Sequence, residues 1–338
     1  MNNLPSVSIV VLNWNGQSFL EQFLPSICAS TYPNLQVIIG DNASTDNSVS
    51  FVRSHYSKVR IILNDKNYGF AGGYNKVLDQ VESDYYILLN SDVEVEPGWI
   101  EPVIELMESD SKIAAAQPKV RSYRAKHMFE YAGAAGGFMD FLGYPLCRGR
   151  IFDTVEADTG QYDDVKEIFW ASGAALFIRR SRWEEVGGLD EDFFAHMEEI
   201  DLCWRLKNIG LKVMYCPNSV VYHVGGGTLS SENPFKTYLN FRNNLILIQK
   251  NLPFFHSALV IFCRLWLDLI ALIKFLYDGK TKDAWAVNKA HVSFFKDLFK
   301  NARKASKIPT AGFNSTGIIK TSIVWHYFAL KKKTFKSL

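Results

Sequence analysis

The chain has 338 residues, of which 48% are apolar and 21% charged, a composition typical of a folded protein and not of a disordered one. Its 37 basic and 35 acidic residues give a net charge of +2, so overall charge provides no reason to expect nucleic acid as a partner. The five cysteines are scattered without a CxxC pair, which predicts free thiols and excludes an obvious zinc site. The first residues lack a basic segment followed by a long apolar one, so we expect no signal peptide.

Strand-like and helix-like patterns alternate over roughly the first 120 residues. We expect strands in the apolar, β-branched runs at residues 6–13, 37–40, 59–63 and 86–89. Helical patterns lie between or after these runs, at residues 17–29, 46–55, from about 69 and from 97. This alternation predicts an α/β fold with a mostly parallel sheet flanked by helices. Residues 121–165 are expected to be an irregular excursion, and residues 168–178 to form a further strand.

The stretch from Tyr86 to Val95 combines a buried strand with a polar end. Its apolar run stops abruptly at Asn90, Ser91 and Asp92. Open α/β sheets bind ligands at the carboxyl ends of their strands, so Asp92 is expected at a ligand-binding edge. A carboxylate there suits a divalent cation that also binds phosphate. The alternative interpretation is an ordinary turn or helix cap after a strand.

Three polar loops follow three of the predicted strands, at residues 41–48, 67–75 and 90–92. In a parallel sheet these loops meet at one edge, and the glycines of the middle loop would let backbone N–H groups approach a phosphate. The middle loop is not GxGxxG and follows the third strand, which argues against a dinucleotide fingerprint.

Two further groups of residues are candidates for chemistry. The first turn of a predicted helix contains three acids, Glu198, Glu199 and Asp201. One interpretation is that their negative charge interacts favourably with the positive end of the helix dipole. The other is that one of them is a general base whose pKa is raised by its neighbours. His223 ends a strand-like run before three glycines, and both a metal ligand and a structural histidine fit that position.

Six motifs in this order resemble family 2 glycosyltransferases with the GT-A fold, close to the bacterial rhamnosyltransferase-like branch. They lie at residues 10–16, 41–46, 67–75, 89–92, 198–205 and 222–226, so the resemblance extends over about residues 6–245. It implies that 1–245 is the GT-A domain, with a Rossmann-like nucleotide-binding half. The donor site would contain Asn13, Asp41, Asn67, Gly69, Gly72, Gly73 and Asn90.

The resemblance also implies the reacting groups. Asp92 and His223 would bind Mg²⁺ or Mn²⁺, and Glu199 would be the catalytic base, with Glu198 and Asp201 as alternatives. Two positions depart from the family pattern: Glu199 stands where Asp is usual, and Asn90 replaces the first acid of Asp-x-Asp. The replacement at position 90 removes one negative charge from the metal site.

The implied reaction is an inverting transfer of a sugar from a nucleotide-diphosphate donor, dTDP-rhamnose or a UDP-sugar. The acceptor would be a hydroxyl of a lipid-linked or cell-surface glycan precursor. Two other functions fit the same sequence: a sugar-nucleotide nucleotidyltransferase, and a catalytically silent, nucleotide-sugar-binding membrane scaffold. A nucleotidyltransferase would be expected to carry a basic, glycine-rich loop after its first strand, where this chain has Trp14-Asn15-Gly16-Gln17.

Residues 246–338 differ from the rest in composition. Residues 258–277 are mostly apolar but interrupted by Arg264, Asp268 and Lys274, which favours an interfacial or re-entrant helix over a membrane span. A buried helix of a soluble domain is the alternative. The basic residues that follow suit an anionic membrane surface, so we expect a peripheral or monotopic protein at the cytoplasmic face of the cell membrane, or otherwise a cytoplasmic one.

Overall fold

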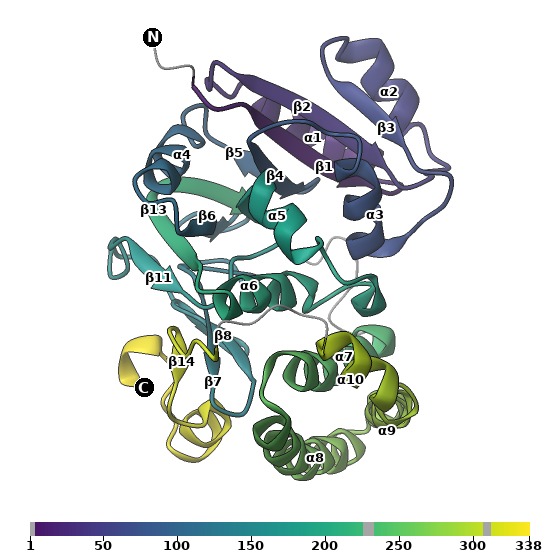
Figure 1. The fold of residues 1–338 in the computed structure, drawn as a ribbon, viewed down its shortest axis with the longest axis vertical. Helices are drawn as coiled ribbons and strands as arrows, with labels where there is room; N and C mark the ends of the chain where they lie inside the picture. The colour runs from purple at the N-terminus through teal and green to yellow at the C-terminus, as the bar shows by residue number, and fades with distance from the viewer. Residues whose placement is uncertain (1–3, 226–232, 307–311) are drawn as a thin grey trace.

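The computed structural model describes residues 4–225, 233–306 and 312–338, and its centre is a nine-stranded sheet (Figure 1). The strand order is β11-β13-β6-β12-β4-β1-β2-β3, with β5 paired to β13. The strands of this sheet are β1 (Val7–Asn13), β2 (Leu35–Asp41), β3 (Arg60–Leu63), β4 (Tyr85–Asn90), β5 (Val93–Val95), β6 (Ile113–Ser122), β11 (Lys166–Ile168), β12 (Ala175–Arg179) and β13 (Lys212–His223).

The strands from the first part of the chain form the parallel part of the sheet. β1 pairs in parallel with both β2 and β4, and β2 pairs in parallel with β3. This register sets Asn13 opposite Asp41 and Leu12 opposite Asn90, so the polar strand ends share one edge as expected. Beyond β4 the sheet is mixed, because β12 runs antiparallel to both β4 and β6.

Helices cover both faces of the sheet, each over its own apolar core. One core receives side chains from α1 (Gln17–Cys28), α2 (Ser48–His55) and α4 (Glu101–Glu108). The other receives side chains from α3 (Gly69–Leu78), α5 (Arg180–Val186) and α6 (Glu198–Asn208). Successive residues of β1 point to opposite cores, because Ile9 packs in the first core and Val10 in the second. This explains the continuous apolar run from Ile9 to Leu12 in β1.

The predicted irregular excursion at 121–165 instead contributes a second sheet, of order β10-β9-β8-β7-β14. Its strands are β7 (Gly137–Asp140), β8 (Pro145–Cys147), β9 (Arg150–Ile151), β10 (Thr154–Val155) and β14 (Ile318–Ile319). Gly143 and Gly149 adopt φ of +80° and +96°, values that glycine reaches without strain, in the turns that join β7 to β8 and β8 to β9. The predicted strand at 168–178 is likewise divided, between β11 and β12.

Four helices form the layer below the sheet in Figure 1: α7 (Pro234–Asn251), α8 (Phe254–Tyr277), α9 (Thr281–Lys296) and α10 (Leu298–Ala305). The remaining short helices are η1 (Glu191–Phe193), η2 (Trp325–Ala329) and η3 (Phe335–Ser337). Arg264 and Asp268 of α8 are buried, and Asp268 contacts His291 of α9 at 3.0 Å. Among the helices of the described ranges, none combines the length and the apolar character needed to cross a bilayer. The predicted boundary at residue 245 falls inside α7, and the division there stays a prediction.

Candidate active site

The carboxyl ends of β1 and β2 bring Asn13 and Asp41 into contact. The Nδ2 of Asn13 donates to Oδ1 of Asp41 at 3.0 Å and to the Ser48 hydroxyl at 2.9 Å. The other oxygen of Asp41 accepts from the Ser44 amide at 2.9 Å. Both predicted donor-site residues are buried, and Oδ1 of Asn13 has no hydrogen-bond partner. A buried acceptor without a partner carries a free-energy cost that a ligand donor would remove.

The glycine-rich loop at residues 67–75 lies next to these residues at the same edge of the sheet. Oδ1 of Asn67 accepts from the Gly69 amide at 2.8 Å, where the chain turns into α3 with φ of +71°. A Cβ at Gly69 would lie 2.7 Å from the Phe194 ring, and one at Gly73 would lie 2.8 Å from the Asn42 amide. A Cβ at Gly72 would lie 3.0 Å from Cβ of Tyr68. All three glycines therefore have a packing reason, and their contact with a donor diphosphate stays a prediction.

Asp92 and His223 form a buried polar cluster with a residue that the sequence did not reveal. Nε2 of His223 lies 3.1 Å from Oδ1 of Asp92 and 3.4 Å from Nδ2 of Asn90. On the other side of the ring, Nδ1 lies 3.3 Å from the carboxylate of Glu130. Burial by itself lowers the pKa of His223, but Asp92 and Glu130 outweigh it and raise the pKa to about 10.

The chemistry of this cluster fits a divalent cation that takes some of its ligands from the protein and the others from a bound substrate. The described residues contain no group of three or more His, Cys, Asp and Glu side chains arranged as a complete metal site. Mg²⁺, however, is commonly held by one or two protein ligands together with substrate phosphates and water. The carboxylate of Asp92 and the imidazole of His223 supply such a partial set, provided that Nε2 of His223 loses its proton when the cation binds.

Glu198 and Glu199 begin α6 in a low-dielectric environment. Glu198 is buried, Glu199 is partly buried, and each has one carboxylate oxygen without a hydrogen-bond partner. Burial raises the pKa of Glu199 to about 7. Burial and the adjacent charge of Glu199 hold the pKa of Glu198 well above its usual value. Glu199 lies beside Gly173, where an added Cβ would also meet the Phe70 ring of α3 at 3.2 Å. A carboxylate of pKa near 7 is suited to accept a proton at neutral pH.

Asp201 has a different environment from its two neighbours. Its oxygens lie 2.8 Å from Arg205 and 2.9 Å from Lys250 of α7, in the core of the protein. Burial favours the neutral acid, but Lys250 and Arg205 outweigh it and lower the pKa of Asp201 below its usual value. This ion pair joins α6 to α7, so the geometry gives Asp201 a structural task.

The turn that leads into α6 is strained and is held by α7. Phe194, His196 and Met197 all have positive φ, between +63° and +75°. Such conformations cost free energy in residues other than glycine and persist only where the surroundings enforce them. Nδ2 of Asn243 donates to the carbonyl groups of Phe193, Ala195 and His196, at 3.0, 2.9 and 2.7 Å. The sequence signal for this role is slight: a polar Asn243-Asn244 pair before an apolar run.

Comparison with known proteins relates the first part of the chain to a family. The family model for glycosyl transferase family 2 matches residues 8–155. The chain is 27% identical over 231 residues to an N-acetylglucosaminyl-diphospho-decaprenol L-rhamnosyltransferase of Mycobacterium tuberculosis, covering 64% of this chain and 75% of the relative. It is 21% identical over 248 residues to a low-salt glycan biosynthesis hexosyltransferase of Haloferax volcanii, covering 72% and 75%.

Solved structures of glycosyltransferases share the fold of this chain, which is GT-A. A crystal structure of GalNAc-T7 with UDP, GalNAc and Mn²⁺ has a TM-score of 0.57 at 16% identity, covering 74% of this chain and 48% of that one. A mannosyltransferase of Pyrobaculum calidifontis in complex with GDP-Man and Mn²⁺ has a TM-score of 0.53 at 14% identity, covering 88% of both chains. The predicted fold class is therefore confirmed.

Proposed function

We propose that this protein is a family 2 glycosyltransferase, which transfers a sugar, with inversion, from a nucleotide-diphosphate donor to a hydroxyl of a glycan precursor. The observation that carries the proposal is the carboxylate of Glu199, which has a pKa of about 7 and an unpartnered oxygen. The likeness to an N-acetylglucosaminyl-diphospho-decaprenol L-rhamnosyltransferase supports a rhamnosyl donor and a lipid-linked acceptor. We therefore propose dTDP-rhamnose as the donor, with a UDP-sugar as the alternative.

In the proposed reaction Glu199 accepts the proton of the acceptor hydroxyl as that oxygen bonds to the anomeric carbon. The bond from the anomeric carbon to the diphosphate oxygen breaks on the opposite face, so no covalent enzyme intermediate is needed. Asn13 and Asp41 would orient the nucleotide, with Asn67, Asn90 and the α3 loop glycines alongside. Mg²⁺ or Mn²⁺ bound by Asp92 and His223 would neutralise negative charge on the leaving diphosphate.

The helices after the GT-A domain would place the enzyme at a membrane. We assign residues 1–245 to the catalytic domain and 246–338 to a membrane-interfacial region at the cytoplasmic face. The long exposed face of α8 supports this, because it carries Phe255, Phe262 and Trp266 at exposed fractions of 86%, 59% and 59%. A membrane-bound acceptor would then meet the active site without leaving the bilayer surface.

The decisive experiment measures hydrolysis and transfer with a panel of nucleotide sugars, with and without Mn²⁺, in the presence of membrane extract as acceptor source. We expect one donor to be turned over, with loss of turnover in both Asp92→Ala and Glu199→Gln. Glu82→Gln is the matched control, because Glu82 is exposed just before β4, at the opposite end of the strand from Asp92. Nucleotide binding without any turnover would instead support a catalytically silent scaffold.

A further inference from the structure

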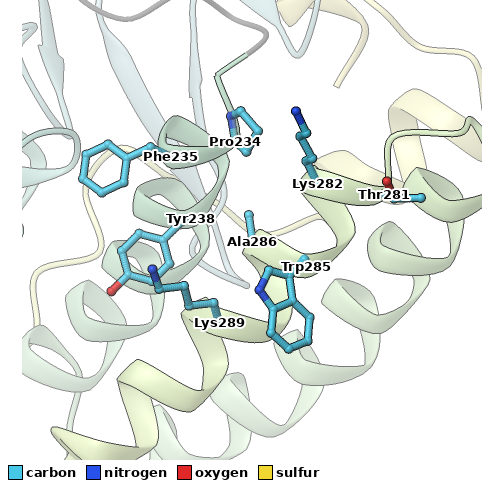
Figure 2. A pocket seen from close by; sticks show the side chains of 8 residues that line it. All are labelled: Pro234, Phe235, Tyr238, Thr281, Lys282, Trp285, Ala286 and Lys289. Carbon is cyan, nitrogen blue, oxygen red and sulfur yellow. The ribbon is translucent and has the colours of Figure 1, made fainter.

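A cavity of about 510 Å³ lies between the first turns of α7 and α9, and none of the residues discussed above as donor, metal or base candidates lines it. Its lining residues are Pro234, Phe235, Tyr238, Thr281, Lys282, Trp285, Ala286 and Lys289. Figure 2 shows the rings of Tyr238 and Trp285 on either side of Ala286, with the Lys289 side chain extended toward Tyr238. Aromatic rings and two ammonium groups thus line the same space.

Two lysine side chains and no acidic side chain line the cavity. The ammonium group of Lys289 lies 5.3 Å from the centre of the Tyr238 ring, and neither Lys289 nor Lys282 forms an ion pair within the described residues. The nearest acid in sequence, Asp283, accepts a hydrogen bond from Thr237 at 2.6 Å. Thr281 begins α9, and the N-terminus of a 16-residue helix adds partial positive charge. These features together suit an anion.

The cavity lies near the candidate active site and includes an exposed apolar side chain. The ring of Phe235 is 6.2 Å from that of Phe194, whose carbonyl accepts from the Phe70 amide at the start of α3. Trp285, which also lines the cavity, has an indole that is 68% exposed. A ligand in the cavity would therefore have one part near the donor loop and another against this indole.

We propose that this cavity binds the diphosphate of an acceptor whose saccharide is joined through that diphosphate to an apolar chain. Lys282 and Lys289 would pair with the diphosphate, and Trp285 would pack against the first part of the chain. The saccharide would extend past Phe235 toward Glu199. The inference rests on the proposed glycosyltransferase function and specifies its acceptor. A phospholipid headgroup shares the same chemistry, a phosphate ester on an apolar chain, so the test has to separate the two sources.

The test uses the full chain and farnesyl diphosphate, a soluble isoprenoid diphosphate, in an equilibrium binding titration without donor or metal. We expect the double variant Lys282→Gln and Lys289→Gln to weaken binding at least tenfold. The matched control is Lys280→Gln with Lys296→Gln, which removes the same charge from exposed positions at the two ends of the same helix but outside the cavity. The control is expected to bind within twofold of the unmodified protein, and thermal unfolding verifies that both double variants are folded.

Three results would overturn the assignment. Equal weakening in the two double variants would mean general attraction to positive charge, and undiminished binding in the cavity variant would place the diphosphate elsewhere. If the cavity variant lost binding only to phosphatidylglycerol vesicles and not to farnesyl diphosphate, the occupant would be a bilayer headgroup. Because the titration needs no sugar transfer, a failure of the proposed catalytic function would appear separately, as absence of donor turnover.

Discussion

The three acids at the start of α6 differ in their ionisation although they are close neighbours in the sequence. Burial raises the pKa of Glu198 and Glu199, whereas two cations lower that of Asp201. In enzymes, neighbouring acids whose environments give them different pKa values have different roles. Of the three, Glu199 alone combines a pKa of about 7 with partial exposure, and we therefore infer that it is the base.

The first prediction concerns the pH dependence of transfer. A general base acts in its ionised form, so kcat/KM should fall about tenfold for each pH unit below the Glu199 pKa of about 7, and level off above it. Glu199→Gln should lower kcat/KM by about 10²- to 10⁴-fold and remove this acid limb. The measurement is a pH–rate profile of both proteins; an acid limb of the same midpoint in the variant would assign it to another group.

Glu198 provides the matched comparison for the same reaction. Burial and the charge of Glu199 raise the pKa of Glu198 and so favour its neutral form, which glutamine resembles in shape. Glu198→Gln should therefore keep kcat/KM within about fivefold, with the pH midpoint still near 7. Steady-state kinetics at several pH values checks this. Loss of transfer here, together with activity in Glu199→Gln, would exchange the two roles.

At the scale of elements, α7 fixes the turn from which α6 begins. Removing the Asn243 amide takes a hydrogen-bond donor from the carbonyl groups of Ala195 and His196, which should cost about 1–3 kcal/mol of unfolding free energy. The Phe193 carbonyl would keep its other donors. The positive-φ residues would then relax and shift Glu199, so Asn243→Ala should lower kcat by about tenfold or more while nucleotide affinity stays within about twofold. Urea unfolding, kinetics and nucleotide titration measure the three quantities.

Asn244 is a stringent control for that experiment. It is also buried and adjacent in sequence, but its Nδ2 donates to the Gly143 carbonyl at 2.7 Å, next to the second sheet, and its Oδ1 accepts from the buried Arg264 of α8. Asn244→Ala should therefore show a stability loss at least as large, because a buried charge loses a partner, but without the loss of kcat. If both variants lost kcat in proportion to stability, the effect of Asn243 would be a general one and not a positioning of α6.

The elements that the sequence predicted are those whose pattern is local. β1 to β4 contain continuous apolar runs with polar ends, and parallel pairing alone brings Asn13, Asp41 and Asn90 to one edge. β9, β10 and β14 have two residues each, too few for any periodicity, and Ile318 of β14 pairs with Met139 of β7, far earlier in the chain. Such pairing depends on the tertiary fold.

In the candidate site, too, the sequence predicted the residues that belong to local patterns and missed those brought in by the tertiary fold. Strand-end residues such as Asp92 and His223 follow recognisable patterns, and the structure brings these two together at 3.1 Å. Glu130 had no pattern, because its approach to His223 depends on the path of the intervening chain. Asp201 belonged to the same acidic turn as Glu199, and only its ion pairs, above all with Lys250 on another helix, distinguish the two.

At the scale of the whole molecule, the outer face of α8 exposes a row of apolar side chains to solvent. The charged residues Arg264 and Asp268 point inward and are buried, so exposed apolar side chains occupy the opposite face: Phe255, Leu259, Phe262, Trp266, Ile270 and Ile273. Residues 254–305 contain nine Lys and Arg but four Asp and no Glu. An apolar face within a positively charged region favours an anionic bilayer surface over an acidic or neutral protein partner.

The last prediction tests that surface directly. Sedimentation with phosphatidylglycerol vesicles should recover the protein, and Phe262→Glu with Ile270→Glu should lower the partition coefficient well over tenfold. Each large apolar side chain contributes about 1.5–3 kcal/mol when removed from water, and about 1.4 kcal/mol is a factor of ten. The control, Leu4→Glu with Val165→Glu, adds the same charge at exposed apolar positions outside the C-terminal helices and should bind as the unmodified protein does.

The vesicle experiment would also distinguish a membrane from a second copy of the chain as the partner of the apolar face of α8. If the unmodified protein ignored vesicles but formed a concentration-dependent dimer that the α8 variant abolished, the face would be an interface between two copies of the chain. The bilayer interpretation instead requires vesicle binding that falls as salt rises, because screening weakens attraction between the basic residues and anionic lipid. Residual binding at high salt would measure the apolar contribution of α8 alone.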